Sequence, residues 1–409
     1  MKTMRMSIPS WFPHKQIGKV VRYLGGNETT RIVGGTVRDI LLDREGVDVD
    51  LATSLAPTEV QRLLAARSIK TIPTGIEHGT ISAIYQPGQI CEITTLRKDI
   101  DCYGRWASIE FTDRWDEDAA RRDFTINAMF MDLDGNIYDY YDGLNDISRN
   151  VVRFVGNPVR RIEEDALRIL RYFRMLANMG LECIDQPSMG AAITLAGNIA
   201  TLSRERVRQE MCKLLVAPHA CKVLQIMLDG GVGSYIGMTD IRPTDIADIQ
   251  FGLDYLANLA ATMLTTAAPE AAVEVISANW RLSNKEIKVL TQLCDRTSAK
   301  KYPLQHLHQP VNIHKRQIFA SGLSFYLHYI KLLATSEKIP LAKIEELEKM
   351  AVSYQPVALP INGHDLIAVG IAKEGIGRAL KVAKKIWMAH DFCISKQDLM
   401  RIILDKILD

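Results

Sequence analysis

Two short segments near the N-terminus constrain the fold of this chain more than any other feature. Ile32 and Val33 are typical of the end of a strand, and Gly34 and Gly35 permit a tight turn whose backbone N–H groups can face an anion. The residues that follow, 37–42, have the pattern of a helix start. The sequence therefore predicts a strand, a turn and a helix arranged so that a triphosphate fits at the helix start.

Residues 47–51 follow within a dozen positions and alternate between apolar and acidic side chains. On a strand, Asp48 and Asp50 project from one face while their apolar neighbours enter the core. Two adjacent carboxylates repel each other, and a divalent cation relieves that repulsion, most simply the Mg²⁺ ions that steady the attacking and leaving oxygens in phosphoryl transfer. The alternative is a solvated acidic edge strand.

Three further positions extend this candidate site. Arg38 lies in the first turn of the predicted helix, where its guanidinium can reach the oxygens that the turn faces, and Asp39 is expected to order the turn. Glu92 lies on a predicted strand over 91–96 and could add a third carboxylate that orients or deprotonates an attacking hydroxyl. A simple exposed strand position remains the alternative for Glu92.

A pair of arginines, Arg121 and Arg122, precedes an apolar face that begins at Phe124, so both are expected to point at the cleft. Arg121 has the alternative of an ion pair with Asp116 or Asp118.

The order of four motifs resembles the bacterial class II tRNA nucleotidyltransferases, the CCA-adding enzymes, and their poly(A) polymerase relatives. The resemblance runs from about residue 30 to 215 and returns at 359–366, at the start of the family's tail region. The motifs are Gly34-Gly35-Thr36-Val37-Arg38-Asp39, Asp48-Val49-Asp50, Arg121-Arg122-Asp123-Phe124-Thr125-Ile126-Asn127-Ala128 and Glu164-Asp165-Ala166-Leu167-Arg168-Ile169-Leu170-Arg171.

The resemblance implies roles for further residues. Gly35 and Arg38 would hold the triphosphate, and Arg122, Arg171 and Arg174 would contact the nucleotide. The polar segment 97–105, with Gly104 as a flexible point, is similar to a mobile loop that full CCA-adding enzymes possess.

The pair Asp165 and Arg168 is a candidate reader of the nucleobase. On one helix the two are i and i+3 neighbours, for which a local ion pair is the ordinary explanation. Cytosine and adenine each present an amino donor beside a ring-nitrogen acceptor, whereas guanine and uracil present a carbonyl beside an N–H donor. A fixed carboxylate and a fixed guanidinium therefore match C and A and mismatch G and U.

The resemblance implies an enzyme that adds the 3′-terminal CCA to tRNA, with CTP, ATP and a tRNA lacking its complete 3′ end as substrates and Mg²⁺ as cofactor. Alternatives within the family are a poly(A) polymerase and an enzyme that adds only C or only A. An alternative of another class is a non-catalytic RNA-binding protein. No obligatory protein partner is evident.

The chain of 409 residues is expected to form an α+β fold, with a mixed-sheet head followed by an all-α neck, body and tail. The predicted divisions are 1–145 for the catalytic head, 146–215 for the neck, 216–340 for the body and 341–409 for a tRNA-binding tail. Residues 1 to about 30 favour an amphipathic helix that ends at Gly25.

Composition bounds the partners and the compartment. Seven scattered cysteines and the lack of a long apolar run favour a cytoplasmic protein without a membrane segment. The net charge is only +2, so contacts to nucleic acid must come from local clusters. Candidates for contact with the tRNA backbone are Arg160, Arg161, Arg204, Arg206, Arg208 and Lys213.

Overall fold

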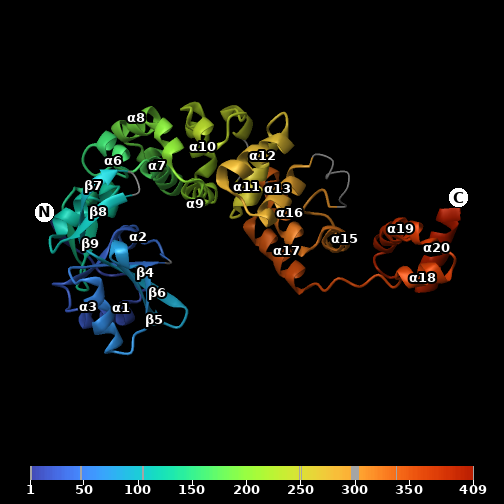
Figure 1. The fold of residues 1–409 in the computed structure, drawn as a ribbon, viewed down its shortest axis with the longest axis horizontal. Helices are drawn as coiled ribbons and strands as arrows, with labels where there is room; N and C mark the ends of the chain where they lie inside the picture. The colour runs from blue at the N-terminus through green and yellow to red at the C-terminus, as the bar shows by residue number, and fades with distance from the viewer. Residues whose placement is uncertain are drawn as a thin grey trace. The chain divides into compact units, whose positions relative to one another are not determined.

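The computed structural model describes residues 2–46, 48–103, 106–247, 249, 251–295, 304–337 and 339–408. It forms two compact units, the first of Met1–Thr244 with Asn279–Arg281 and the second of Asp245–Ala278 with Leu282–Asp409. Strands occur in the N-terminal part of the first unit and helices make up the remainder of the described chain (Figure 1). The predicted α+β fold class is confirmed, whereas the predicted borders at 145, 215 and 340 stay predictions.

An eight-stranded mixed sheet forms the head, in the order β1-β10-β9-β2-β3-β6-β5-β4. Of the described neighbours, β3 and β6 run parallel and the other pairs antiparallel. The strands are β1 (Lys2–Arg5), β2 (Thr30–Val33), β3 (Val49–Thr53), β4 (Thr71–Gly75), β5 (Thr80–Gln86), β6 (Gln89–Thr95), β9 (Met129–Met131) and β10 (Asn136–Asp139).

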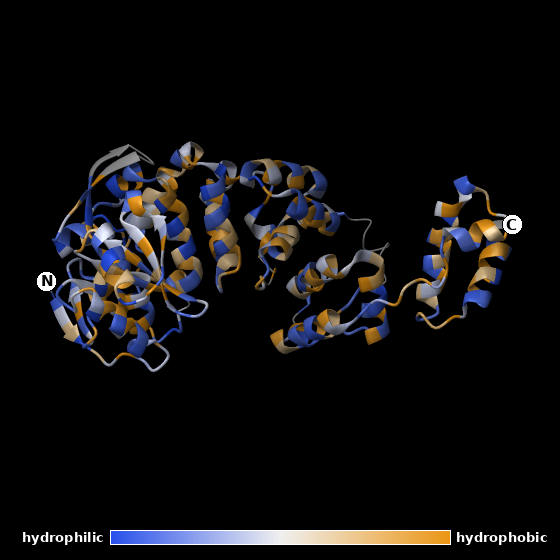
Figure 2. Cartoon of the chain, turned by 60° about the horizontal axis from the view of Figure 1, so that its bottom comes forward, coloured by the Kyte–Doolittle hydropathy of each residue, from blue (hydrophilic) through white to orange (hydrophobic). Residues whose placement is uncertain are grey.

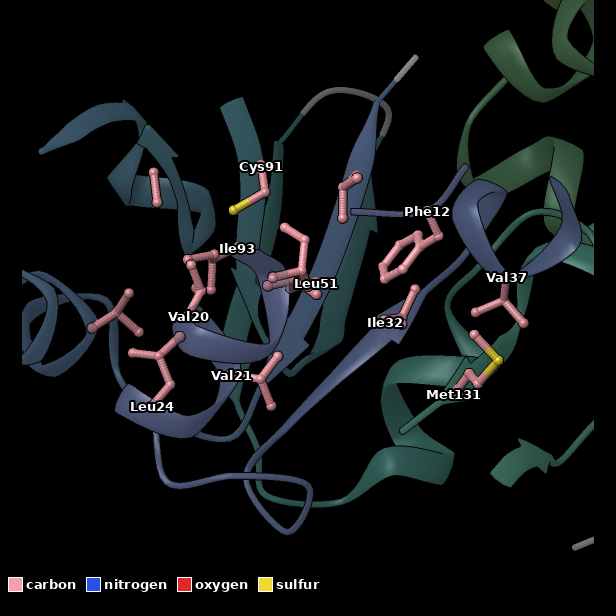
Figure 3. Close-up of a cluster of buried hydrophobic side chains, with 14 of the residues drawn as sticks. Phe12, Val20, Val21, Leu24, Ile32, Val37, Leu51, Cys91, Ile93 and Met131 are labelled. Carbon is pink, nitrogen blue, oxygen red and sulfur yellow. The ribbon is translucent and has the colours of Figure 1, made fainter. Parts of the chain in front are cut away.

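Hydrophobic side chains bury both faces of this sheet. On one face, Val20 and Val21 of α1 meet Leu51 of β3 and Ile93 of β6 (Figure 3). A second cluster includes Ala52, the neighbour of Leu51, because successive strand residues point to opposite faces. The helices of the head are α1 (His14–Tyr23), α2 (Gly35–Leu41), α3 (Pro57–Ala65), α4 (Trp115–Ala120) and α5 (Gly143–Ser148).

The structure corrects the expectation for the first residues. The amphipathic helix is α1, with Ile17 and Leu24 fully buried, but β1 precedes it and pairs with β10 at the edge of the sheet. All four residues of β1 are exposed, so they show no apolar alternation that would indicate a strand.

The segment expected as a mobile loop contains regular structure, and its mobility stays a prediction. It forms a two-stranded hairpin of β7 (Arg97–Tyr103) and β8 (Trp106–Phe111), in which Lys98 pairs with Glu110 across the strands at 3.0 Å. Backbone pairing and cross-strand charge pairs support a hairpin of polar composition. Gly104, the expected flexible point, lies outside the described residues.

Helices that follow the head carry hydrophilic and hydrophobic residues side by side (Figure 2), as expected for elements with one buried face. In the first unit they are α6 (Pro158–Glu164), α7 (Leu167–Met179), α8 (Gln186–Thr194), α9 (Arg204–Leu215) and α10 (Ala220–Asp229). The others are α11 (Tyr255–Leu264), α12 (Pro269–Trp280), α13 (Asn284–Cys294), α15 (Val311–Ser321), α16 (Leu323–Ser336), α17 (Leu341–Ser353), α18 (Gly363–Ala368), α19 (Ile376–Ala389) and α20 (Lys396–Leu408). Among the described residues, no helix combines the length and the apolar character that crossing a membrane requires.

Candidate active site

The turn between β2 and α2 requires a glycine at its first position. Gly34 has φ +68° and ψ −128°, a conformation that a residue with a Cβ rarely adopts, whereas Gly35 begins the helix with no such constraint. A Cβ on Gly34 would lie 3.2 Å from a guanidinium nitrogen of Arg122. The turn therefore brings Arg122 and the start of α2 together, and of the two glycines predicted to form it, Gly34 is the one whose backbone conformation requires glycine.

Thr36 ties this turn to the acidic strand. Its Oγ1 accepts a hydrogen bond from the backbone N–H of Asp50 at 2.9 Å and donates one to the carbonyl of Asp48 at 3.3 Å. The side chain is almost fully buried. The hydroxyl thus fixes the distance between the turn and the two aspartates, a role for which the sequence held no signal beyond the position of Thr36 inside the glycine motif.

Three predicted carboxylates gather at the start of β3. Asp50 is the direct register partner of Glu92 on the parallel strand β6, and Asp48 immediately precedes β3. Asp48 and Glu92 are exposed and Asp50 is half-buried. Burial, together with the negative charges of Glu92 and Asp48, raises the pKa of Asp50 to about 6, against the opposing charges of Arg122 and Arg38. The structure therefore brings together these predicted residues of the candidate site.

This group of acids is chemically suited to a divalent cation. Carboxylate oxygens are the ligands that Mg²⁺ prefers, and a cation would relieve the repulsion that raises the pKa of Asp50. In the part of the chain that the structure describes, no three His, Cys, Asp or Glu side chains are already arranged around a common metal position. Asp48 and Asp50 are the residues that would hold the ion.

Arg121 and Arg122 share one buried carboxylate. Asp118, 1% exposed, accepts hydrogen bonds from both guanidinium groups at 2.7 Å. Its burial acts to raise its pKa, but the two arginines hold that pKa below its usual value. The ion pair with Asp118 that was the alternative for Arg121 is thus present, and Arg122 forms an ion pair with the same carboxylate.

Arg38 contacts two side chains of the head. Its guanidinium donates to Asp39 at 2.8 and 2.9 Å and to the side-chain oxygen of Asn127 at 2.8 Å. The amide nitrogen of Asn127 donates in turn to Asp123 at 3.2 Å. Asn127 and Asp123, neither of which was predicted as a site residue, therefore connect the turn to the segment that follows the arginine pair.

Asp123 extends this connection to the neck helices. Arg171 of α7 donates to its carboxylate at 2.5 and 2.8 Å. Glu210 of α9 accepts from Arg174 at 2.6 Å and lies 3.9 Å from Arg171. Burial acts to raise the pKa of Asp123, but Arg171 and the hydrogen bonds hold it at about 2. A continuous polar network therefore runs from α2 to α9.

The expected helical pair of Asp165 and Arg168 is not formed. Asp165 is the C-cap of α6 in an extended conformation, and its carboxylate binds Arg206 of α9 at 2.9 and 3.1 Å. Arg168 binds Glu164 at 2.7 Å and donates to the backbone carbonyls of Arg161 and Arg121. The placement of both residues on one helix was wrong, because α6 ends at Glu164 and α7 begins at Leu167, and the ion pair that was the alternative to base reading is therefore absent between them. Arg206, a candidate for contact with RNA, pairs with Asp165, and its contact with RNA stays a prediction.

A pocket of about 930 Å³ opens beside these groups. The predicted residues Arg122, Asp165, Arg168 and Arg171 line it. The other predicted site residues do not belong to its lining, namely Gly35, Arg38, Asp48, Asp50, Glu92 and Arg174. Other lining residues are His78, Arg97, Asp99, Ile109, Arg121, Asp123, Glu164, Leu167, Ser203, Glu205, Arg206 and Gln209. Arg122 belongs to this lining and also acts on the pKa of Asp50, so it links the acidic group to the pocket.

Comparisons with known proteins show the family to which this chain is similar. A model of the poly A polymerase head domain matches residues 30–153, and a model described as the probable RNA and SrmB-binding site of polymerase A matches residues 183–236. The mitochondrial CCA tRNA nucleotidyltransferase 1 of Homo sapiens is 31% identical over 393 residues, which cover 92% of this chain and 87% of the human protein. The CCA-adding enzyme of Lactobacillus johnsonii is 32% identical over 366 residues, which cover 86% and 87% of the two chains.

A solved structure is similar over nearly the whole chain. The crystal structure of the Bacillus stearothermophilus CCA-adding enzyme in complex with CTP matches with a TM-score of 0.80 and 26% identity. The match covers 97% of this chain and 98% of that one.

Replacing Thr36 by valine tests the tie between α2 and β3. Valine keeps the shape and removes the hydroxyl, so the buried N–H of Asp50 loses its partner. We expect the free energy of unfolding to fall by about 1–3 kcal/mol, measured by urea denaturation. Thr36→Ser retains the hydroxyl and serves as the control. Its free energy of unfolding should fall much less than that of the valine variant. Equal stability of the valine variant and the wild type would contradict the role of this hydroxyl.

The ion pair of Asp123 predicts a specific pH dependence of stability. The pKa of Asp123 in the folded chain lies below its ordinary value of 3.8, so its stabilisation is fully present above about pH 4 and is lost as the pH falls toward about 2. Thermal unfolding should show Asp123→Asn to be less stable than wild type by on the order of 2 kcal/mol at pH 7. The difference should shrink toward pH 2.5, and Glu45→Gln, at an exposed position, should show no such trend. A difference that stays constant with pH would contradict the ion pair.

Proposed function

Because this chain belongs to the CCA-adding family of tRNA nucleotidyltransferases, we propose that it adds the 3′-terminal CCA to tRNA, with CTP and ATP as substrates. One observation supports this activity above all. Arg122 lines the pocket of about 930 Å³, and its guanidinium also lies against Gly34 in the turn beside the acidic group, so one bound nucleotide can reach both.

In the proposed reaction the terminal 3′-hydroxyl of the RNA attacks the α-phosphorus, a new P–O bond forms, and the bond to pyrophosphate breaks. Gly35 and Arg38 hold the triphosphate through backbone N–H groups and the guanidinium. Asp48 and Asp50 hold Mg²⁺, which when bound supplies positive charge that offsets the charge on the attacking and leaving oxygens. Glu92, beside Asp50 in register, orients the hydroxyl and accepts its proton.

Two arginines are proposed to contact the nucleotide directly, and a third to act through them. Arg122 and Arg171 line the pocket, and each retains a buried carboxylate partner that fixes its position. Arg174 lies outside the pocket lining and pairs with Glu210, so its proposed contribution passes through Glu210 to Arg171.

Asp165 and Arg168 are proposed to read the base from two sides of the α6–α7 junction. A guanidinium has five N–H donors, and the hydrogen bonds of Arg168 to Glu164 and two carbonyls engage three of them. The remaining donors, with the Asp165 carboxylate, supply the donor and acceptor that cytosine and adenine require. A base with the opposite pattern would leave these polar groups unpaired, which disfavours its binding.

Incorporation assays test the activity. A tRNA that lacks its 3′ end is incubated with the protein and with each labelled nucleotide in turn. Ordered addition of two C residues and one A is the expected result. Addition of A alone in long runs would indicate a poly(A) polymerase, and no incorporation would indicate an RNA-binding protein.

Asp48→Ala tests the acidic group. We expect incorporation of both C and A to fall by about a thousandfold or more, because the charge stabilisation at the reacting phosphate is lost. Binding of tRNA, measured by filter retention, should stay near the wild-type level. Glu45→Ala, a nearby exposed carboxylate, is the control and should remain active. Turnover of Asp48→Ala at the wild-type rate would refute the proposed role.

Asp165→Ala tests the reading of the base. Without the acceptor, we expect the preference for CTP over UTP, measured as the ratio of kcat/KM values, to fall by about 10–100-fold. The matched control is Glu163→Ala, an exposed acid two residues earlier. A preference that survives in Asp165→Ala would exclude the carboxylate as the reader.

A further inference from the structure

Arg97 lies at a point where two parts of the head meet. It is the first residue of β7. This strand begins two positions after the end of β6, which carries Glu92. Its side chain lines the nucleotide-sized pocket together with Arg121 and Arg122. No role for Arg97 follows from the proposed function.

The partners of Arg97 differ from those of its neighbours. Within the described part of the chain, Arg121, Arg122, Arg168, Arg171 and Arg206 line the pocket and each forms an ion pair with a carboxylate. In the described part of the chain, Arg97 forms no ion pair. One of its terminal nitrogens donates a hydrogen bond to the backbone carbonyl of His78. Its Nε is buried and has no hydrogen-bond partner.

The surroundings of Arg97 favour an anionic ligand. Three guanidinium groups, those of Arg97, Arg121 and Arg122, lie close together, and Asp118 is the carboxylate that two of them bind. Burial, followed by the charge of Arg121, lowers the pKa of Arg97 to about 10, so it still carries its charge at neutral pH. The charges of Asp99 and Asp118 also act on Arg97, but neither forms an ion pair with it in the described part of the chain. Because the side chain lines the pocket, its terminal N–H groups can bind an anionic oxygen there.

We propose that Arg97 binds a phosphate oxygen of the substrate in this pocket. The inference rests on the proposed function for the identity of that substrate. The phosphate belongs either to the triphosphate of the incoming nucleotide or to the phosphodiester next to the RNA 3′ end. Both present the same chemistry to a guanidinium, because each offers anionic oxygens that accept charge-assisted hydrogen bonds.

Two substitutions separate a phosphate contact from a purely structural one. Arg97→Gln keeps an N–H donor for the His78 carbonyl and removes the charge, whereas Arg97→Lys keeps a charge. The matched control is Lys98→Gln, the next residue on the same strand, whose ammonium pairs with Glu110 and does not line this pocket. If Arg97→Gln does not fold, Arg97→Lys and the wild type still give the comparison, because lysine cannot reproduce the geometry of the guanidinium.

Steady-state kinetics identify the source of the phosphate. If Arg97 binds the triphosphate, Arg97→Gln should raise the KM for CTP and ATP by about tenfold or more with a small change in kcat, and inhibition by inorganic tripolyphosphate should weaken by a similar factor. If it binds the RNA, the KM for tRNA should rise instead and inhibition by tripolyphosphate should stay unchanged. In either case Arg97→Lys should recover part of the loss and Lys98→Gln should resemble the wild type.

Direct binding measurements keep this inference separate from the proposed function. Calorimetric titration of tripolyphosphate and of a trimmed tRNA into wild type and variants requires no turnover, so it reports the contact even if the wild type fails to add C or A. Equal affinities of the wild type and both Arg97 variants for both probes would overturn the inference. A loss confined to thermal stability would also overturn it.

Discussion

The ion pair between Asp123 and Arg171 is the interaction on which the geometry of the site depends. The carboxylate is buried, so without its partners it would be strongly unfavourable as an anion. The same carboxylate receives the amide of Asn127, whose oxygen receives Arg38. The position of the turn between β2 and α2 is therefore tied, through three side chains, to helix α7.

The two halves of the proposed chemistry have different physical origins. The acidic group arises from strand register, which sets Asp50 opposite Glu92 on neighbouring parallel strands. The pocket arises from helix packing, which presents an arginine of α7 to the buried Asp123 and an arginine of α9 to the half-buried Asp165. In the proposed reaction, nucleotidyl transfer uses the acidic group and the selection of a nucleotide uses the pocket.

Local patterns in the sequence predicted much of this arrangement. The alternation around Asp50 and the glycine pair predicted β3 and the turn before α2, and the mixed head with a helical remainder is confirmed. What could not be predicted depends on contacts between distant segments. Asp165 pairs with Arg206, 41 residues away, and not with Arg168 on the same presumed helix. The hairpin of β7 and β8 was not predicted because polar residues dominate the sequence of β7, which therefore lacks the apolar alternation of a strand.

The parallel pairing of β3 and β6 also limits how this protein can change over evolution. A strand exchanges its two faces when it slips by one residue, so an inserted residue in β3 would turn the Asp50 carboxylate into the cluster around Leu51 and expose an aliphatic side chain in its place. Point substitutions in the helices leave that alternation intact. Lineages of this family should therefore tolerate insertions between helices far more readily than the gain or loss of one residue within this strand pair.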